Sequence, residues 1–397
     1  MTGTSDYQAR YADSLLGIFG TPSLVLERGE GCWVWDVDGN RYLDLVGGIA
    51  VNALGHNHPE LVAAVSKQVA SAIHISNFFT SRAQIELAER LLELAGAPAG
   101  SRVFFANSGA EAIEGAIKLA RRTGRPGIIA AEGAFHGRTT GALALTAKPA
   151  YREPFDPLLP GVVRVPYDDV AALEAALTPD IGAVVLEPIQ GEAGVVVPSP
   201  DYLGKARELT TSAGALLIID EIQTGIGRTG SWFAFQEAGI TPDAITLAKG
   251  LAGGVPIGAL VTFGPDVSGL LTAGMHGSTF GGNPLAASAG LAVLATIERD
   301  DLLGNAVRLG NHIANRVAAL GHPGVQGTRG RGLLRAIQLT AEIAPAVAAQ
   351  ARAAGFIVNP VHPSALRLAP PLILTTAEAD LFVDALPTLI DAAEETS

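Results

Sequence analysis

Short apolar runs recur through the middle of the chain, and alanine- and leucine-rich segments of helical pattern separate most of them. The runs are four or five residues long and show little alternation of apolar and polar positions. This pattern is typical of strands that are buried on both faces of a sheet. We predict strands at Val103–Ala106, Gly127–Ala131, Val162–Val165, Ala183–Leu186, Ala215–Ile219, Ala244–Leu247 and Ala259–Phe263. Strands that alternate with helices favour an α/β fold with a mostly parallel sheet.

The connection between the last two predicted strands is short. It covers Ala248–Gly258, with the sequence AKGLAGGVPIG, and is rich in glycine. A crossover between parallel strands needs about a dozen residues or more, usually including a helix. We therefore expect the strand at Ala259–Phe263 to run antiparallel.

The two ends of the chain predict a second, smaller lobe. Near the N-terminus, WVWDVDGNRYLDL is typical of a hairpin that turns at Asp38-Gly39. Near the C-terminus, GRGLLRAIQL, FIVNPV and ALRLAP predict strands set among helices.

Composition and charge exclude several classes of protein. Hydrophobic residues make up 48% of the 397 residues, which excludes wholesale disorder. Charged residues make up only 17%, against about 25% in typical domains, and such a chain often hides surface in a subunit interface. The net charge is −12 without a dense run of lysine and arginine, which argues against nucleic acid and anionic membranes as partners.

Metal, disulfide and membrane signals are weak. A single cysteine, Cys32, excludes an internal disulfide and a cysteine-rich metal site. The histidines form no HExxH pair, so we predict no metal. The first twenty residues lack the apolar core of a signal peptide, and no apolar run reaches the roughly 20 residues of a membrane span. We expect a soluble, cytoplasmic protein.

Lys249 stands out among only five lysines. It follows the apolar run AITLA and precedes a glycine-rich loop. Partial desolvation of an amine at the end of a buried strand lowers its pKa and favours the neutral nucleophile, which is what a Schiff base requires. A lysine that extends from a strand end to solvent is an equally good interpretation of position alone.

Asp220 and Glu221 end the apolar run ALLIID. Open α/β sheets bind ligands at the carboxyl ends of their strands. A carboxylate there has two functional interpretations. It could bind Mg²⁺ beside a nucleotide, or it could pair with a protonated pyridine nitrogen. The first alternative requires a GxxxxGK[ST] loop, which this sequence lacks. A helix cap or an ion pair is the ordinary structural alternative.

Ser108-Gly109-Ala110-Glu111 opens a predicted helix after the strand VFFAN. Ser-x-x-Glu is a capping box, and the free amides of the same turn form an anion site. A lysine at a strand end, a strand-end carboxylate and a phosphate cradle together are the three attachments of pyridoxal 5′-phosphate. The combination points to this cofactor, whereas each signal alone decides nothing.

Eight motifs in a fixed order resemble the class III aminotransferases of pyridoxal-phosphate fold type I. The similarity runs from about Thr21 to Pro387. The motifs are GIAVNALGHNHP, SGAEA, AFHGRT, LEPIQGEAGV, IIDEIQTGIGRTG, LAKGLAGGVPIGA, HGSTFGGNP and RLAPPL. The resemblance implies a large cofactor-binding domain over residues 51–284. It also implies a small α/β domain from residues 285–397, which the N-terminal segment 1–50 joins.

The resemblance also assigns the cofactor contacts. Lys249 would be the Schiff-base lysine and the proton shuttle, and Asp220 would pair with the ring nitrogen. Gln223 would contact the ring hydroxyl and Phe135 would stack on the ring face. Ser108, Gly109 and Ala110 would hold the phosphate.

Further residues are assigned to the substrate and to a second subunit. Thr279 would reach the phosphate of the neighbouring subunit's cofactor, which implies a homodimer with composite sites. Ser278 and Arg138 would hold the acylated end of the amine donor. Arg367 would bind the α-carboxylate of glutamate or 2-oxoglutarate, and Glu192 would mask Arg367 when the longer donor is bound.

The implied reaction is transfer of the δ-amino group of N2-acetylornithine to 2-oxoglutarate, a step of arginine biosynthesis. Donors that share the machinery remain alternatives, namely succinylornithine, succinyldiaminopimelate, ornithine and 4-aminobutyrate. A non-transaminating relative, such as an aminomutase, racemase or decarboxylase, is a second class, because fold does not fix the reaction. A binding protein that has lost catalysis is a third class, and the presence of Lys249, Asp220 and Thr279 together argues against it.

Overall fold

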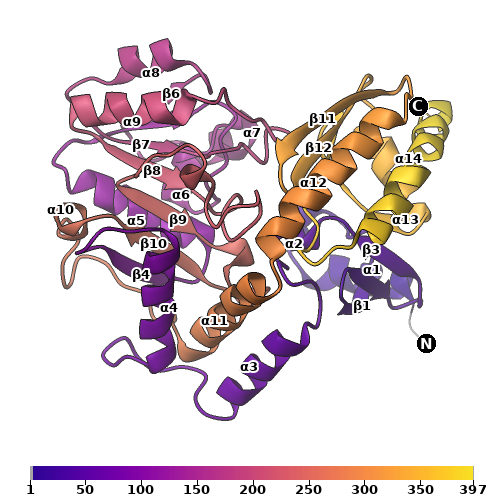
Figure 1. Ribbon diagram of the computed structural model, residues 1–397, viewed down its shortest axis with the longest axis horizontal. Coiled ribbons are helices and arrows are strands. Elements are labelled where there is room, and N and C mark those ends of the chain that lie inside the picture. Colours follow the sequence, from indigo (N-terminus) through magenta and orange to yellow (C-terminus); the bar gives the residue numbers. More distant parts are fainter. Residues whose placement is uncertain (1–2, 397) are drawn as a thin grey trace.

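A seven-stranded sheet forms the centre of the larger lobe in the computed structural model, which describes residues 3–396 (Figure 1). In spatial order its strands are β4 (Arg102–Ala106), β10 (Gly258–Thr262), β9 (Ala244–Leu247), β8 (Leu216–Asp220), β7 (Ile181–Leu186), β5 (Gly127–Ala131) and β6 (Val162–Val165). All seven predicted strands are present. The prediction for the last one is confirmed, because β10 is antiparallel to both β4 and β9 while the other pairs are parallel.

Helices cover the sheet and extend from it toward the smaller lobe (Figure 1). The α-helices of the larger lobe and its lower edge are α3 (Pro59–Val69), α4 (Arg82–Leu94), α5 (Gly109–Arg121), α6 (Thr140–Leu145), α7 (Pro149–Arg152), α8 (Val170–Ala176), α9 (Tyr202–Ala213), α10 (Pro265–Ser268) and α11 (Pro284–Arg299). Short 3-10 segments lie at η1 (Gly17–Phe19), η2 (Glu153–Phe155), η3 (Ala234–Gln236) and η4 (Lys249–Ala252). No helix within residues 3–396 has the length and apolar character needed to cross a membrane.

Two four-stranded sheets lie in the smaller lobe. One has the order β1 (Leu26–Glu30), β2 (Trp33–Asp36), β3 (Arg41–Asp44), β13 (Phe356–Ile357), and the other the order β11 (Val325–Arg331), β12 (Leu334–Leu339), β15 (Ala365–Leu368), β14 (Asn359–His362). Its helices are α1 (Thr4–Ser14), α2 (Gly47–Ala50), α12 (Leu302–Ala319), α13 (Ala344–Ala353) and α14 (Thr376–Thr396). The predicted hairpin is confirmed: β2 and β3 are antiparallel, and Gly39 adopts φ 87°, which suits glycine.

The N- and C-terminal parts of the chain share the first of these sheets. β3 pairs in parallel with β13, so that Leu43 lies opposite Phe356 and Asp44 opposite Ile357. The smaller lobe therefore takes strands from both ends of the chain.

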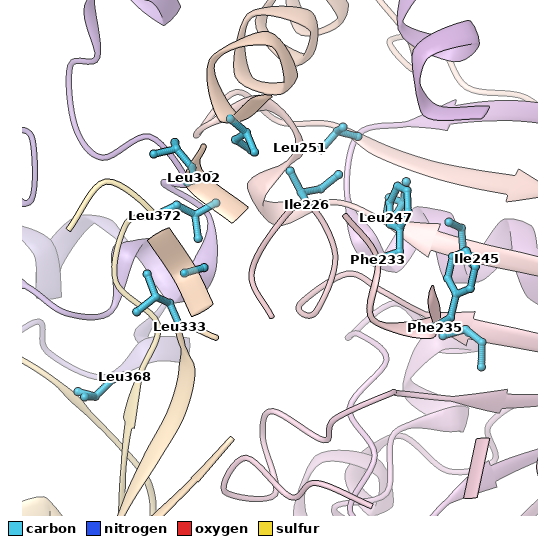
Figure 2. Close-up of a cluster of buried hydrophobic side chains, with 14 of the residues drawn as sticks. Ile226, Phe233, Phe235, Ile245, Leu247, Leu251, Leu302, Leu333, Leu368 and Leu372 are labelled. Carbon is cyan, nitrogen blue, oxygen red and sulfur yellow. The ribbon is translucent and has the colours of Figure 1, made fainter. Parts of the chain in front are cut away.

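One continuous hydrophobic core links the two lobes. Figure 2 shows the junction, where Ile226 and Leu251 lie between side chains of the large sheet and side chains of the smaller lobe. The labelled members are Ile226, Phe233, Phe235, Ile245, Leu247, Leu251, Leu302, Leu333, Leu368 and Leu372. A close-packed interior has little freedom to slide, so this core fixes the position of β15 relative to the strand ends of the large sheet.

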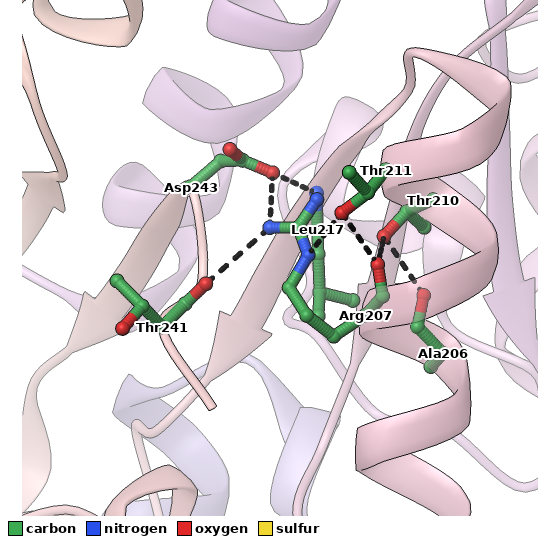
Figure 3. A network of polar contacts seen from close by, with 7 residues as sticks. All are labelled: Ala206, Arg207, Thr210, Thr211, Leu217, Thr241 and Asp243. Atoms are coloured by element: carbon green, nitrogen blue, oxygen red, sulfur yellow. Dashed lines mark hydrogen bonds and ion pairs between the residues drawn. The ribbon is translucent and has the colours of Figure 1, made fainter. Parts of the chain in front are cut away.

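A polar network fixes the starts of β8 and β9 (Figure 3). Arg207 of α9 donates to the Asp243 carboxylate at 2.7 Å and to the Thr241 carbonyl at 3.4 Å. The same carboxylate accepts the Leu217 amide at 2.6 Å. Because both strands are anchored at this end, the residues at their opposite ends are held in fixed register.

Candidate active site

Lys249 follows β9 and opens the short η4 turn. Its backbone has φ 40°, a left-handed conformation that costs a non-glycine residue about 1–3 kcal/mol and is concentrated at functional sites. The side chain lines a cavity of about 150 Å³. Burial, reinforced by the positive charge of Arg367, lowers the pKa of Lys249 to about 8. The sequence-based expectation of a desolvated amine is confirmed, and near pH 8 half of it is the neutral nucleophile.

Asp220 lies on the neighbouring strand and lines the same cavity. It is 4% exposed and accepts hydrogen bonds from the Thr246 hydroxyl and the Ile222 amide, both at 3.0 Å. His136 Nδ1 lies 2.7 Å from its other oxygen and donates to it, because an ionised carboxylate can only accept. Three donors thus surround this one carboxyl group. A ring nitrogen placed in the cavity would meet the Asp220 carboxylate.

Glu221 faces away from the cavity. Its carboxylate accepts the Phe235 amide at 2.8 Å and the hydroxyl of Thr224. Burial raises its pKa to about 7. Successive residues at a strand end point to opposite sides, so of the two adjacent acids only Asp220 reaches the cavity.

The start of α5 forms the third side of the cavity. Ser108 is the N-cap, and its hydroxyl accepts the Glu111 amide at 3.2 Å, while Glu111 accepts the Asn107 amide at 2.8 Å. The predicted capping box is therefore present only in part, because Ser108 caps the Glu111 amide but Glu111 accepts from Asn107, one residue before the N-cap, and not from Ser108. The first amides of a helix have no partner inside the helix, and Gly109 and Ala110 line the cavity. A Cβ on Gly109 would lie 2.8 Å from Ile222 Cδ1, so a larger residue here would push against the Ile222 side chain, which lines the same cavity.

Glu192 and Arg367 meet at the edge of the same cavity. Arg367 of β15 is 2% exposed, and it donates to the Glu192 carboxylate, to Asn359 Oδ1 at 2.8 Å and to Gln223 Oε1 at 3.3 Å. Burial alone would raise the pKa of Glu192, but the charge and hydrogen bond of Arg367 outweigh it, so this pKa lies below its ordinary value. The contact is therefore a charged pair.

The remaining predicted residues lie around this centre. Phe135 lines the cavity, and Arg138 Cζ lies 5.7 Å from its ring centroid and 3.4 Å from that of Tyr151. Ser278 accepts Asn107 Nδ2 at 3.1 Å, next to the N-cap of α5. Thr279, by contrast, is exposed and does not line the cavity.

Two residues of this centre, His136 and Glu187, were not predicted from the sequence. His136 is buried against Asp220, and only its place beside Phe135 in AFHGRT hinted at it. Glu187 follows β7 and lines the cavity, with one buried carboxyl oxygen that has no hydrogen-bond partner. Burial and the nearby charge of Asp220 raise the pKa of Glu187 well above its ordinary value. The sequence feature that could have identified Glu187 is its position at the end of a predicted strand, in the motif LEPIQGEAGV.

In a comparison with known protein families, residues 20–390 match the class-III aminotransferase family. The chain belongs to this family. Among curated proteins, it is 53% identical over 390 residues to the acetylornithine aminotransferase of Mycolicibacterium smegmatis, covering 98% of this chain and 99% of that protein.

Solved structures show the same fold as this class-III aminotransferase. The ornithine aminotransferase of Toxoplasma gondii has a TM-score of 0.94 at 34% identity, covering 100% of this chain and 97% of that one. A second structure of the T. gondii enzyme (TM-score 0.93, 34% identity, 99% and 95% covered) has partial occupancy of pyridoxal phosphate at its active site. Pyridoxal 5′-phosphate is the cofactor of the family. The residues of this class-III aminotransferase fit it, because a lysine amine of lowered pKa, the Asp220 carboxylate and a glycine-lined helix start face one cavity.

Proposed function

We propose that the chain transfers the δ-amino group of N2-acetylornithine to 2-oxoglutarate, giving N-acetylglutamate 5-semialdehyde and glutamate in arginine biosynthesis. The full-length identity to the M. smegmatis enzyme supports this donor. The structural observation that best supports a reaction with two alternating substrates is the charged pair of Glu192 and Arg367 beside Lys249.

The pair suits two amines whose carboxylates lie at different distances from the reacting nitrogen. Glutamate reacts through its α-amine, so its α-carboxylate needs an anchor close to Lys249, and Arg367 supplies a planar fork of donors. Acetylornithine reacts through its terminal amine, so its carboxylate needs an anchor further out, for which we assign Arg138 and Ser278. Glu192 then neutralises Arg367 while the longer donor is bound.

Each residue of the site has a defined task toward the cofactor. Bound pyridoxal 5′-phosphate supplies an aldehyde for the substrate amine and a ring that withdraws electrons from the carbon that loses its proton. We assign Lys249 Nζ to the covalent attachment and to proton transfer, and Asp220 to keeping the ring nitrogen protonated. Phe135 and Gln223 line the same cavity, where Phe135 would pack on the ring face and Gln223 would contact the ring hydroxyl. Ser108, Gly109 and Ala110 hold the phosphate at the positive end of α5.

We also propose a homodimer. Phe78, Phe79 and Phe280 are 93%, 74% and 57% exposed. Asn77 donates to the carbonyls of Ser278 and Gly281 at 2.9 and 3.1 Å, so the segment before Phe78 lies beside the segment that contains Thr279. A patch of exposed aromatic residues is typical of an interface. In the dimer, Thr279 would reach the phosphate of the neighbouring subunit's cofactor.

Two expectations from the sequence stay predictions. One is the cytoplasmic location. The other is the division into residues 1–50, 51–284 and 285–397, which the pairing of β3 with β13 supports.

The test of the proposed function is the absorption spectrum of the purified holoenzyme, recorded before and after addition of N2-acetylornithine without any oxo acid. Conversion of the cofactor band to that of the aminated cofactor supports the donor. A band that is present and does not move removes acetylornithine as the donor while the cofactor assignment survives. The same titration with ornithine, 4-aminobutyrate and succinyldiaminopimelate then ranks the other donors.

A further inference from the structure

A second cavity, of about 620 Å³, adjoins the catalytic one. Phe135 and Glu192 line both cavities, so the two meet at these side chains. Three cationic side chains, Lys148, Arg152 and Arg164, line the larger cavity. We call them the outer cation cluster.

The cations of this cluster have no carboxylate partner within residues 3–396. The half-buried Arg152 donates from Nε to the Ala147 carbonyl at 3.2 Å. The half-buried Arg164 donates to the carbonyls of Ala144 and Thr146, and its buried Nε has no partner. Among the other shielded arginines, Arg90, Arg207 and Arg367 pair with acids. Arg228 and Arg335 have no acid partner in the described part of the chain, but each lies alone among carbonyl and amide oxygens instead of sharing a cavity with other cations.

The local charge balance is positive although the whole chain is acidic. Burial and the charge of Arg152 lower the pKa of Arg164, and Asp156 offsets this only in part. Glu132 lines the cavity but is exposed and forms no ion pair with the cluster, and Glu192 is committed to Arg367. Like charges that share a cavity and are only partly offset by a nearby carboxylate repel each other, and a bound anion would relieve that repulsion.

The cluster lies where the far end of a long donor would point. Arg138, assigned to the acylated end of the donor, stacks on Tyr151, and Tyr151 lines the outer cavity. We propose that Lys148, Arg152 and Arg164 bind a carboxylate at the end of a substrate that lies farthest from Lys249. This inference rests on the proposed function. The carboxylate comes either from an acyl group on the amine donor or from the distal carboxylate of the dicarboxylic oxo acid.

Binding is tested first, with ligands that cannot react. N2-succinylnorvaline and N2-acetylnorvaline lack the δ-amine and differ in one carboxylate, so each is titrated into the holoenzyme by calorimetry. A charged hydrogen bond at a half-exposed site is expected to tighten binding of the succinyl compound about tenfold. The double variant Arg152→Gln/Arg164→Gln removes this preference if the acyl carboxylate is bound there.

Kinetics separate the two sources of the carboxylate. One ratio of kcat/KM values compares N2-succinylornithine with N2-acetylornithine as donor, and a second compares 2-oxoglutarate with 2-oxobutyrate as acceptor. A roughly tenfold fall of the first ratio in the double variant assigns the cluster to the acyl group, and a similar fall of the second ratio assigns it to the oxo acid. Two unchanged ratios, together with no binding preference, overturn the proposal.

Controls address folding and charge. Arg164 also binds the carbonyls of Ala144 and Thr146 at the end of α6, so thermal melting accompanies each variant. Arg152→Glu reverses one charge without touching those contacts, and it is expected to make the succinyl ligand bind more weakly than the acetyl ligand. Arg308→Gln, an exposed arginine of α12 paired with Asp301, is the matched control and leaves both ratios unchanged. Wild-type enzyme that is inactive with acetylornithine contradicts the proposed function instead, because the binding experiment does not depend on turnover.

Discussion

Glu192→Gln removes the negative charge that Arg367 meets beside the catalytic lysine, while the length of the side chain is preserved. Arg367 is shielded from water, whereas the Glu192 side chain is 34% exposed. A hydrogen bond to a charged group contributes about 1.5–3 kcal/mol, and partial exposure of one partner favours the lower figure. About 1.5 kcal/mol corresponds to a factor of roughly ten in a rate or binding constant.

The two half-reactions should respond differently to this substitution. Acetylornithine places no carboxylate near Arg367, so in Glu192→Gln this buried guanidinium stays charged and uncompensated throughout the reaction. Glutamate brings its own carboxylate to Arg367 and does not need Glu192. We therefore expect the acetylornithine half-reaction to slow about tenfold and the glutamate half-reaction to change by less than about twofold.

Stopped-flow absorbance of the holoenzyme under single-turnover conditions measures each half-reaction separately. Glu192→Ala, which also removes the hydrogen bond to Arg367, should widen the difference. Equal losses with acetylornithine and glutamate would show that Glu192 supports the site in general and does not switch between substrates. In that case the interpretation of the pair as a removable mask is wrong.

Three further predictions concern the lysine, a buried acid and the subunit contact. Lys249→Ala should abolish the borohydride-reducible adduct with the cofactor, as mass spectrometry of the reduced protein will show; a reducible adduct in this variant would refute the assignment. Burial raises the pKa of Glu221 from 4.5 to about 7, so the folded state binds the extra proton and wild-type stability falls as pH rises through this window. Glu221→Gln lacks this titration, so its free energy of unfolding relative to wild type should rise by up to about 3 kcal/mol between pH 4.5 and 7, as measured by urea titrations. The same pH dependence in both proteins would contradict this. Phe280→Asp should weaken self-association in sedimentation velocity and also loosen cofactor binding, because Thr279 is adjacent to it; a monomeric wild type would refute the dimer.

The central strands were predictable because they are buried on both faces and leave a continuous apolar run, as in Ile181–Leu186. The edge strands β4 and β6 are partly exposed, and their short apolar runs still indicated them. The direction of β10 followed from the length of its connection alone. Lys249 and Asp220 were detectable because they are the first polar residues after such runs. In each case the signal is local in the sequence.

Other parts of the site depend on contacts between distant segments. Asp220 and Glu221 were equivalent in the sequence until the strand direction and the Phe235 amide separated them. The hydrogen bond from His136 to Asp220 joins residues 84 positions apart. The outer cation cluster likewise brings together the loop after α6, the short helix α7 and the strand β6. No periodicity or motif reports such neighbours.

The parallel pairing of β3 with β13 determines when during synthesis the first sheet of the smaller lobe can be completed. The N-terminal hairpin leaves the ribosome first, yet the partner of its β3 edge is synthesised near the end of the chain. During synthesis that edge presents unpaired amides and carbonyls, which are a template for association with other chains. The arrangement makes completion of the smaller lobe one of the last events of biogenesis, and a product that terminates before Phe356 would retain the open edge permanently.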